Sequence, residues 1–230
     1  SLTSRESYSY AGHALTAVDN SSAGRTQTLR YDDAGNLSQQ TDNVSGESKT
    51  MEHDYANRIS AVRNAAGDVV GRYWYDDQGF RVRRISRQKQ EGGDEKEVEL
   101  LYPSMYFGIE RSLGVDGKPD KASGYAVNNI YVNGVRVAAM LPDAQAVYYL
   151  TDQVDSVKVI TDDRGLPITA MEYKPFGETW LTSGKTNHAP KYNSQELDRE
   201  TGFYFYNARH YDPSLAHFVT ADTVIDGEYT

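Results

Sequence analysis

Short segments of alternating apolar and polar residues, separated by glycine-containing turns, run through the whole chain. Residues 69–85 show the pattern best, with the segments Val-Val-Gly-Arg-Tyr-Trp-Tyr and Phe-Arg-Val-Arg-Arg-Ile on either side of Asp-Asp-Gln-Gly. Such alternation is the period of a β-strand. We therefore predict an antiparallel hairpin whose second strand places Phe80 and Val82 on one face and Arg81 and Arg83 on the other.

Tyrosines begin similar short units along the first third of the chain, at Tyr10, Tyr31, Tyr55 and Tyr75. After the second and fourth of these the chain reads Tyr-Asp-Asp-x-Gly. The first aspartate can cap the turn with its side chain, and the glycine can take the left-handed conformation that closes a type I turn with a bulge. A calcium loop is the alternative interpretation, but the twelve-residue ligand spacing and the closing glutamate are missing.

Each of these units is a strand, a turn and a second strand, and such a unit cannot bury its apolar side alone. Neighbouring units must therefore stack against one another, as in other repeat proteins. A further hairpin is predicted around Asn133-Gly134, because a type I′ turn needs positive φ at both central residues. Residues 114–124 are polar and predict a surface loop.

A polar segment, residues 88–97, separates a basic strand from an acidic one. We predict a long hairpin in which opposite charges face each other across the strands. A basic patch for nucleic acid is the alternative, and the acidic strand would neutralise it. The residues concerned are Arg81, Arg83, Arg84 and Arg87 on one side and Glu95, Glu97 and Glu99 on the other.

The C-terminal part, residues 191–222, combines a tight reversal with a run of aromatic residues. Asp198 and Gly202 bracket the reversal, and residues 203–206 read Phe-Tyr-Phe-Tyr. Such a run is accommodated most easily in a sheet that is buried on both faces. Charged residues follow closely, and beside so much apolar surface they are expected to pair with one another. They are Arg209, Asp212 and Asp222.

Composition supports an all-β protein. The chain has 230 residues with 18 tyrosines, 19 glycines and no cysteine, and aromatic rings pack well on pleated surfaces. So many tyrosines also argue against disorder. A net charge of −9 is unlike the basic surface of a nucleic-acid-binding protein. No apolar run has membrane-spanning length, and no signal peptide opens the chain. Because Ser1 is not an initiator methionine, we expect a piece of a longer protein.

Two aspartates are the candidate catalytic residues. Asp212 and Asp222 flank a short apolar stretch, and a reversal there would bring the carboxylates together. Two carboxylates in one site share a proton, which suits general acid–base attack of water on a peptide. Arg209 is a candidate orienting or pairing residue. The alternative is structural: Asp212 caps the turn at Pro213, and Asp222 pairs with Arg209.

Other chemistry is not indicated. The sequence contains no phosphate-binding loop and no metal-ligand cluster, so we predict no cofactor and no metal. Its five histidines are dispersed, and we interpret His210 and His217 as hydrogen-bonded structural residues.

Several segments together resemble the core domain of Rhs proteins, also called YD-repeat proteins. This family includes the shell-forming C component of insecticidal toxin complexes and, more distantly, teneurins. Where family members read His-Leu-Gly-Ser, this chain reads Gln153-Val-Asp-Ser156, so any role of that histidine or glycine is absent or altered. The matching segments are Glu196-Leu-Asp-x-x-Thr-Gly202, Tyr204-x-x-Asn-Ala-Arg-x-Tyr-Asp-Pro213 and His217-Phe-x-x-x-Asp222, with the Tyr-Asp units in the first third.

The resemblance implies stacked antiparallel hairpins in a curved, spiralling sheet. Residues 1–146 would be the YD-repeat region, and residues 147–230 the Rhs repeat-associated core domain, truncated before the cleavage site. In the family such sheets form a hollow shell around a C-terminal effector, in bacterial toxins that are secreted or exposed at the cell surface. The implied partners are the rest of the shell and the effector. Open sheet edges would also allow self-association, whereas nucleic acid and membrane insertion by this segment are not expected.

The resemblance also implies self-cleavage in the full-length protein, at a bond downstream of the second aspartate. Here Thr223 follows Asp222 in place of the usual proline, and no scissile motif precedes Thr230. We therefore expect this chain to be inactive, and an enzyme at most as an aspartate-dependent autoprotease in the full-length chain. Two other classes stay open: a cell-surface module that binds carbohydrate or protein, and a hydrolase that acts on other molecules.

Overall fold

A computed structural model describes residues 6–20, 22–89, 95–120, 124–184 and 190–222. Sixteen strands form one antiparallel sheet in which each strand pairs with the next along the chain. The strands are β1 Glu6–Ala11, β2 Ala14–Asn20, β3 Arg25–Tyr31, β4 Leu37–Asp42, β5 Ser48–His53, β6 Ile59–Arg63, β7 Val69–Tyr75, β8 Arg81–Lys89, β9 Glu95–Ser104, β10 Phe107–Ser112, β11 Tyr125–Val132, β12 Val135–Met140, β13 Ala146–Thr151, β14 Val157–Thr161, β15 Pro167–Tyr173 and β16 Thr179–Gly184.

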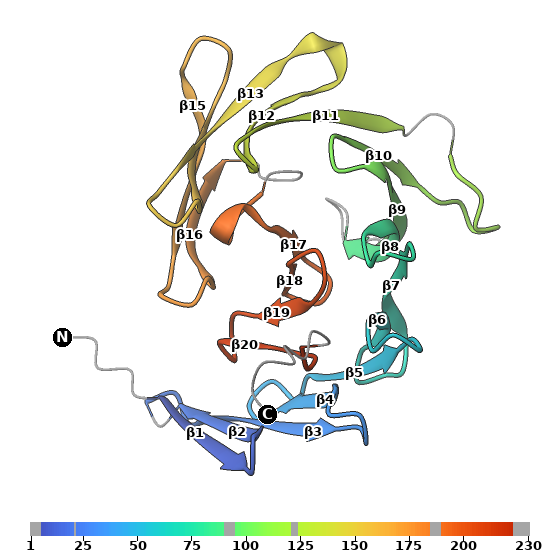
Figure 1. The fold of residues 1–230 in the computed structure, drawn as a ribbon, viewed down its shortest axis with the longest axis vertical. Coiled ribbons are helices and arrows are strands. Elements are labelled where there is room, and N and C mark those ends of the chain that lie inside the picture. The colour runs from blue at the N-terminus through green and yellow to red at the C-terminus, as the bar shows by residue number, and fades with distance from the viewer. Residues whose placement is uncertain (1–5, 21, 90–94, 121–123, 185–189, 223–230) are drawn as a thin grey trace, which may run out of the picture.

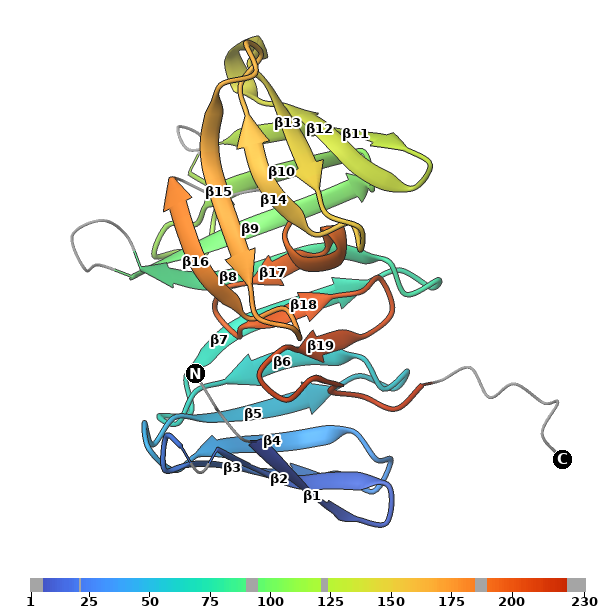
Figure 2. The same ribbon diagram turned by 90° about the vertical axis from the view of Figure 1, so that its left-hand side faces the viewer.

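A second, four-stranded sheet lies in the hollow of the first. The large sheet curves into an open arc (Figure 1), and its strands also climb as a spiral, as the view turned by 90° shows (Figure 2). The small sheet contains β17 Glu196–Asp198, β18 Phe203–Phe205, β19 His210–Asp212 and β20 His217–Phe218, and the 3₁₀ segments are η2 Pro142–Ala144 and η3 Tyr192–Ser194. The prediction of an all-β fold of stacked antiparallel hairpins in a curved, spiralling sheet is thus confirmed.

The turns form as the Tyr-Asp-Asp-x-Gly units predict. Asp32 Oδ1 accepts hydrogen bonds from the backbone N–H groups of Ala34 at 3.0 Å and Asn36 at 2.8 Å. Gly35 has φ +82°, a conformation that a residue with a side chain rarely adopts. Asp76 makes the same two contacts at the next matching turn. The strand register shifts at both turns, as a bulge requires.

Tyr55 does not occupy the same place as Tyr31 and Tyr75. Those two rings pack against the core, whereas Tyr55 is 94% exposed and lies in the turn after β5. His53 ends β5 in the place of the missing tyrosine, and Asp54 follows it as the capping residue. The predicted alignment of the four tyrosines is therefore wrong at Tyr55, because the chain places histidine rather than tyrosine at that strand end.

The β7–β8 hairpin is confirmed, but the faces of its second strand are not. A bulge opposite Trp74 and Tyr75 shifts the register, so that Arg83 lies opposite Trp74 and Arg81 opposite Tyr75. Such an extra residue interrupts the two-residue period. Arg81 is consequently buried, at 2% exposure, on the face of the small sheet, whereas Arg83 lies over the Trp74 ring on the outer face.

Other local predictions agree with the structure. Asn133 and Gly134 have φ of +50° and +82° between β11 and β12. Gly202 donates to the carbonyl of Asp198 at 2.7 Å, which closes the predicted reversal.

The predicted charge pairing across β8 and β9 forms only in part. Arg87 lies opposite Glu97 and Arg83 pairs with Glu99, whereas Arg81 and Arg84 form ion pairs with Asp198 of the small sheet. Residues 90–94, the middle of the predicted polar segment 88–97, lie outside the described residues. So do residues 121–123 of the predicted surface loop 114–124.

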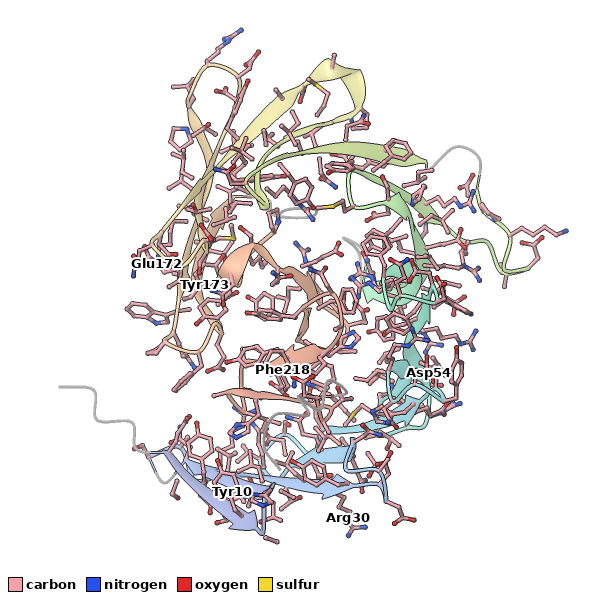
Figure 3. The ribbon with its side chains drawn as sticks, in the orientation of Figure 1. Tyr10, Arg30, Asp54, Glu172, Tyr173 and Phe218 are labelled. Atoms are coloured by element: carbon pink, nitrogen blue, oxygen red, sulfur yellow. The ribbon has the colours of Figure 1, made fainter. Side chains whose placement is uncertain are left out.

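Apolar side chains from both sheets form the largest core cluster. Leucine, valine and methionine side chains of β2 to β6 pack against Phe203, Leu215 and Val219 of the C-terminal segment. The backbone N–H of Leu37 also donates to the carbonyl of Val219 at 2.9 Å. Figure 3 shows Phe218 within the hollow and Arg30 on the outside of the arc. A second cluster, built from β12 to β15, lies under the other part of the arc.

Candidate functional site

A buried group of charged residues connects the large sheet to the small one. The Arg81 guanidinium donates to Asp198 Oδ2 at 2.6 Å and to Glu196 Oε2 at 2.8 Å. Tyr102 Oη donates to the same Glu196 oxygen at 2.8 Å. The Phe205 ring lies 4.4 Å from the guanidinium carbon. The planar guanidinium of Arg81 therefore donates to carboxylates along its edge and lies beside an aromatic ring, an arrangement that stabilises its delocalised charge.

Arg84 and His210 complete this group, which we call the arginine–aspartate cluster. Arg84 forms an ion pair with the other oxygen of Asp198. Tyr73 donates to Glu200 Oε1 at 3.2 Å, and the His210 ring lies 3.4 Å from Asp198. The side chains of Asp198 and Glu200 are almost entirely inaccessible to solvent. So many charges stay buried only because they compensate one another.

Burial and charge pairing shift the pKa values in this cluster in opposite directions. Burial alone would raise the pKa of Asp198, but the two guanidiniums outweigh it and hold that pKa far below its usual value. The pKa of Glu196 is lowered in the same way. Burial raises the pKa of Glu200 to about 7, with only partial opposition from Arg84. Burial lowers the pKa of His210.

These shifts predict how stability depends on pH. A carboxyl whose pKa is lowered by folding stabilises the protein above its unfolded pKa and loses that contribution as the pH falls. We therefore expect the free energy of unfolding to fall steeply below about pH 4.5, where Asp198 and Glu196 become protonated in the unfolded chain. Two other groups act between about pH 4.5 and 7. Glu200, whose pKa is raised by folding, makes the folded state more stable at the acid end of this range. His210, whose pKa is lowered, makes it more stable at the neutral end, so the two effects oppose each other.

Urea unfolding between pH 3 and 8 measures this dependence. The midpoint is expected to change little from pH 5 to 7 and to drop below pH 4.5. An Asp198→Asn variant is expected to start from a lower midpoint and to show a shallower acid limb. An equally steep acid limb in that variant would contradict the assignment.

Asp212 is buried against the large sheet. Its Oδ1 accepts hydrogen bonds from the backbone N–H of Ser214 at 2.8 Å and from the Ser214 hydroxyl at 2.7 Å. Its Oδ2 accepts one from Gln40 Nε2 of β4 at 2.9 Å. Asp212 thus caps the turn at Pro213, as the structural alternative predicts, and also contacts a distant strand that the sequence did not indicate.

Asp222 and Arg209 are brought together. Arg209 Nη2 lies 2.9 Å from Asp222 Oδ2, and the aspartate side chain is 54% exposed. The Arg209 guanidinium also lies over the Phe218 ring. The two candidate aspartates therefore have different surroundings, one buried and one partly open, and their joint catalytic role stays a prediction.

Both C-terminal histidines have structural contacts, as predicted. His210 lies among the rings of Tyr73, Phe203 and Phe205, beside Asp198. His217 Nδ1 lies 2.7 Å from the Leu215 carbonyl, and its Nε2 lies 3.2 Å from Tyr10 Oη.

Asp155 takes over a conformation that glycine adopts easily. The resemblance to Rhs proteins implies a glycine at this position, and Asp155 has φ +60° in the turn closed by Asp152. Aspartate tolerates this left-handed region better than most residues do.

Sequence reasoning missed the cluster as a site. The charge pattern predicts cross-strand pairs with β9 for Arg81 and Arg84, but their partners are carboxylates more than a hundred residues away. One signal was available: three acidic residues alternate at Glu196, Asp198 and Glu200 beside an aromatic run. Buried acids of that kind require cationic partners.

Two family descriptions match this chain. The teneurin YD-shell matches residues 130–228, and the RHS repeat matches residues 31–70. Both descriptions belong to the YD-repeat proteins that the sequence resembles. The matched ranges run from the end of β3 to the start of β7, and from the end of β11 through the C-terminal segment inside the large sheet.

Known proteins that resemble this chain are much longer. Salivary gland surface protein 1 of Aedes aegypti is 27% identical over 187 residues, which are 78% of this chain and 5% of that protein. Double-stranded DNA deaminase toxin A of Burkholderia cenocepacia is 24% identical over 219 residues, which are 86% of this chain and 15% of the toxin. The chain therefore spans only a small part of the relatives it matches.

A solved toxin-complex structure shares the fold. The structure of TcdB2-TccC3-TEV superposes with a TM-score of 0.70 at 17% identity, over 95% of this chain and 12% of that one. This likeness is one of architecture. Among the described residues, no helix is long and apolar enough to cross a membrane.

Proposed function

We propose that this chain is a shell and core segment of a bacterial Rhs-type toxin, whose shell encapsulates a C-terminal effector. The observation that carries the proposal is the arrangement of the two sheets. A curved sheet encloses a separate C-terminal segment and holds it through the buried arginine–aspartate cluster. One relative is itself named a toxin.

The division into domains belongs to the same proposal. Residues 1–146 would be the YD-repeat region, and residues 147–230 the core domain. The sheet runs on from β12 to β13 across this boundary, so the two regions would form one wall rather than two separate bodies. The core strands β17 to β20 would then line the inside of that wall.

Partners and location follow from the open sheet. Among the described strands, β1 and β16 each pair on one side only. An unpaired strand edge exposes backbone N–H and C=O groups that another strand can bind. We propose that adjoining shell strands of a longer chain cover these edges, and that a second copy could do so in their absence. An exported or surface-exposed bacterial protein fits this role.

A surface-binding function is the second candidate. Large apolar residues are exposed on β13, in the β15–β16 turn and on β16. Trp180 is the most exposed of them, at 71%, and the others include Tyr148, Leu150, Phe176 and Leu181. Exposed aromatic residues favour contact with a protein or a carbohydrate. The shell function accounts for more of the structure, because Tyr31, Tyr73 and Tyr75 of the repeat strands are directed into the core.

Protease protection tests encapsulation. In the full-length protein with its natural downstream sequence, the effector is expected to survive a protease that degrades the same effector produced alone. The protection should disappear once urea unfolds the shell. Equal digestion of the free and the shell-linked effector would refute encapsulation.

We further propose that the full-length protein cuts itself through Asp212 and Asp222, with Arg209 orienting Asp222. Asp212 borders a cavity, and the partly open Asp222 is held by a cation. Hydrolysis adds the hydroxyl of water to the peptide carbonyl carbon and breaks the C–N bond. One carboxylate takes the proton of the water, and the other carboxyl supplies a proton to the leaving amine.

A further inference from the structure

A cavity lies between the large sheet and the small sheet at Asp212. Its volume is about 320 Å³, and it is open to solvent on one side. Strands β3 to β5 form one wall, and the β15–β16 turn and the C-terminal segment form the others. The residues that matter here are Gln27, Gln40, Tyr204, Asp212 and Ser214.

Two buried glutamines join Asp212 to the large sheet. Gln40 is 6% exposed, and its Nε2 donates both to Asp212 Oδ2 at 2.9 Å and to Gln27 Oε1 at 2.7 Å. Gln27 is equally buried and lies on the adjacent strand β3. The position of the Gln40 amide is therefore determined by the sheet, and Asp212 receives its hydrogen bond only when that sheet is folded around it.

The other end of the Gln40 amide lacks a partner. Among the described residues, none donates to the buried Gln40 Oε1. A buried carbonyl oxygen normally accepts at least one hydrogen bond. Within the described part of the chain, the two hydrogen bonds that Gln40 Nε2 donates, one of them to Asp212, are therefore what holds the amide in place.

We infer that Gln40 is a positioning residue for Asp212: its amide, fixed by Gln27, holds the carboxylate at the border of the cavity. This inference rests on the proposed self-cleavage. It adds that the site is complete only when strands β3 and β4 of the shell have docked onto the C-terminal segment. Cleavage would thus follow assembly of the shell.

Gln40 acts on Asp212 through one of its two amide protons, because the other is donated to Gln27. A hydrogen bond donated to a carboxylate stabilises its ionised form. Leucine has a similar size but cannot donate, so Gln40→Leu removes this stabilisation. Glutamate has the shape of glutamine but brings a second carboxylate beside Asp212, and two adjacent carboxylates retain one proton to higher pH.

The first experiment measures self-cleavage in the full-length protein as a function of pH. We expect Gln40→Leu to cut at least ten-fold more slowly, and Gln40→Glu to move the acid limb of the pH profile upward by at least one unit. Gln39→Leu and Gln39→Glu are the matched controls, because Gln39 is the neighbouring residue of β4 and bonds to Ser48 instead. They are expected to stay within two-fold of the wild type.

Wild-type rate and pH profile in both Gln40 variants would overturn the inference. Thermal midpoints identify a variant that fails to fold, and the isosteric Gln40→Glu then decides alone through its pH profile. If the wild type itself is not cut, the proposed self-cleavage fails. A second measurement, on the 230-residue chain, then tests the positioning role of Gln40 separately. Amide NMR should show a changed resonance for the backbone N–H of Ser214, which donates to Asp212 Oδ1, in Gln40→Leu but not in Gln39→Leu. An unchanged Ser214 resonance in Gln40→Leu would overturn the positioning role.

Discussion

Replacement of Arg81 by methionine is expected to lower the free energy of unfolding by about 3–5 kcal/mol, the cost of breaking a buried ion pair from one side. Methionine retains much of the apolar length of the arginine side chain but supplies no charge. Asp198 would keep its ion pair with Arg84, whereas Glu196 would lose its ion pair with Arg81 at 2.8 Å. Urea unfolding at pH 7, followed by tyrosine fluorescence, measures the loss.

Arg83→Met is the matched control for that variant. Arg83 lies on the same strand, is 37% exposed and pairs with Glu99. Glu99 is buried but would keep its ion pair with Arg111, so the expected loss is about 1 kcal/mol or less, as for a partly exposed pair. A similar loss in both variants would show that the arginine–aspartate cluster has no special part in holding the two sheets together. A loss below about 1 kcal/mol in Arg81→Met would lead to the same conclusion.

The Asp212→Asn variant of the full-length protein is expected to remain uncut. Asparagine preserves the size of the side chain and an acceptor for the backbone N–H of Ser214, so the turn at Pro213 should survive. It cannot take a proton from water, and it turns an NH₂ group toward Gln40 or forces one of the two amides to rotate. Asp222→Asn is expected to have the same effect, because the proposed chemistry needs both carboxyl groups.

Denaturing electrophoresis measures the cut, with Asp33→Asn as the control. Asp33 is exposed in the β3–β4 turn and lies beside the capping residue Asp32. That variant should be processed like the wild type. Normal processing of both the Asp212 and the Asp222 variants would remove the protease proposal, and normal processing of one of them would reduce the proposed pair to a single aspartate.

Local features of this chain could be read from its residues. The strands have a period of two, and the caps at Asp32 and Asp76 act within four residues of themselves. The turn at Asn133 and the reversal at Gly202 likewise depend on neighbours only. Such features follow from the conformational preferences of a few consecutive residues, and that is why the all-β fold and its repeats were predictable from the chain alone.

Tertiary structure decided which residues meet in the hollow. One bulge beside Tyr75 turned Arg81 inward, and the period of the strand could not reveal it. The contacts of Arg81 with Asp198 and of Gln40 with Asp212 join residues more than a hundred positions apart. Such pairs depend on how far the large sheet curves and where the C-terminal segment settles inside it. The sequence by itself thus determined the wall of hairpins, whereas the folded chain determined what that wall encloses, because burial of charge selects partners in space and not along the chain.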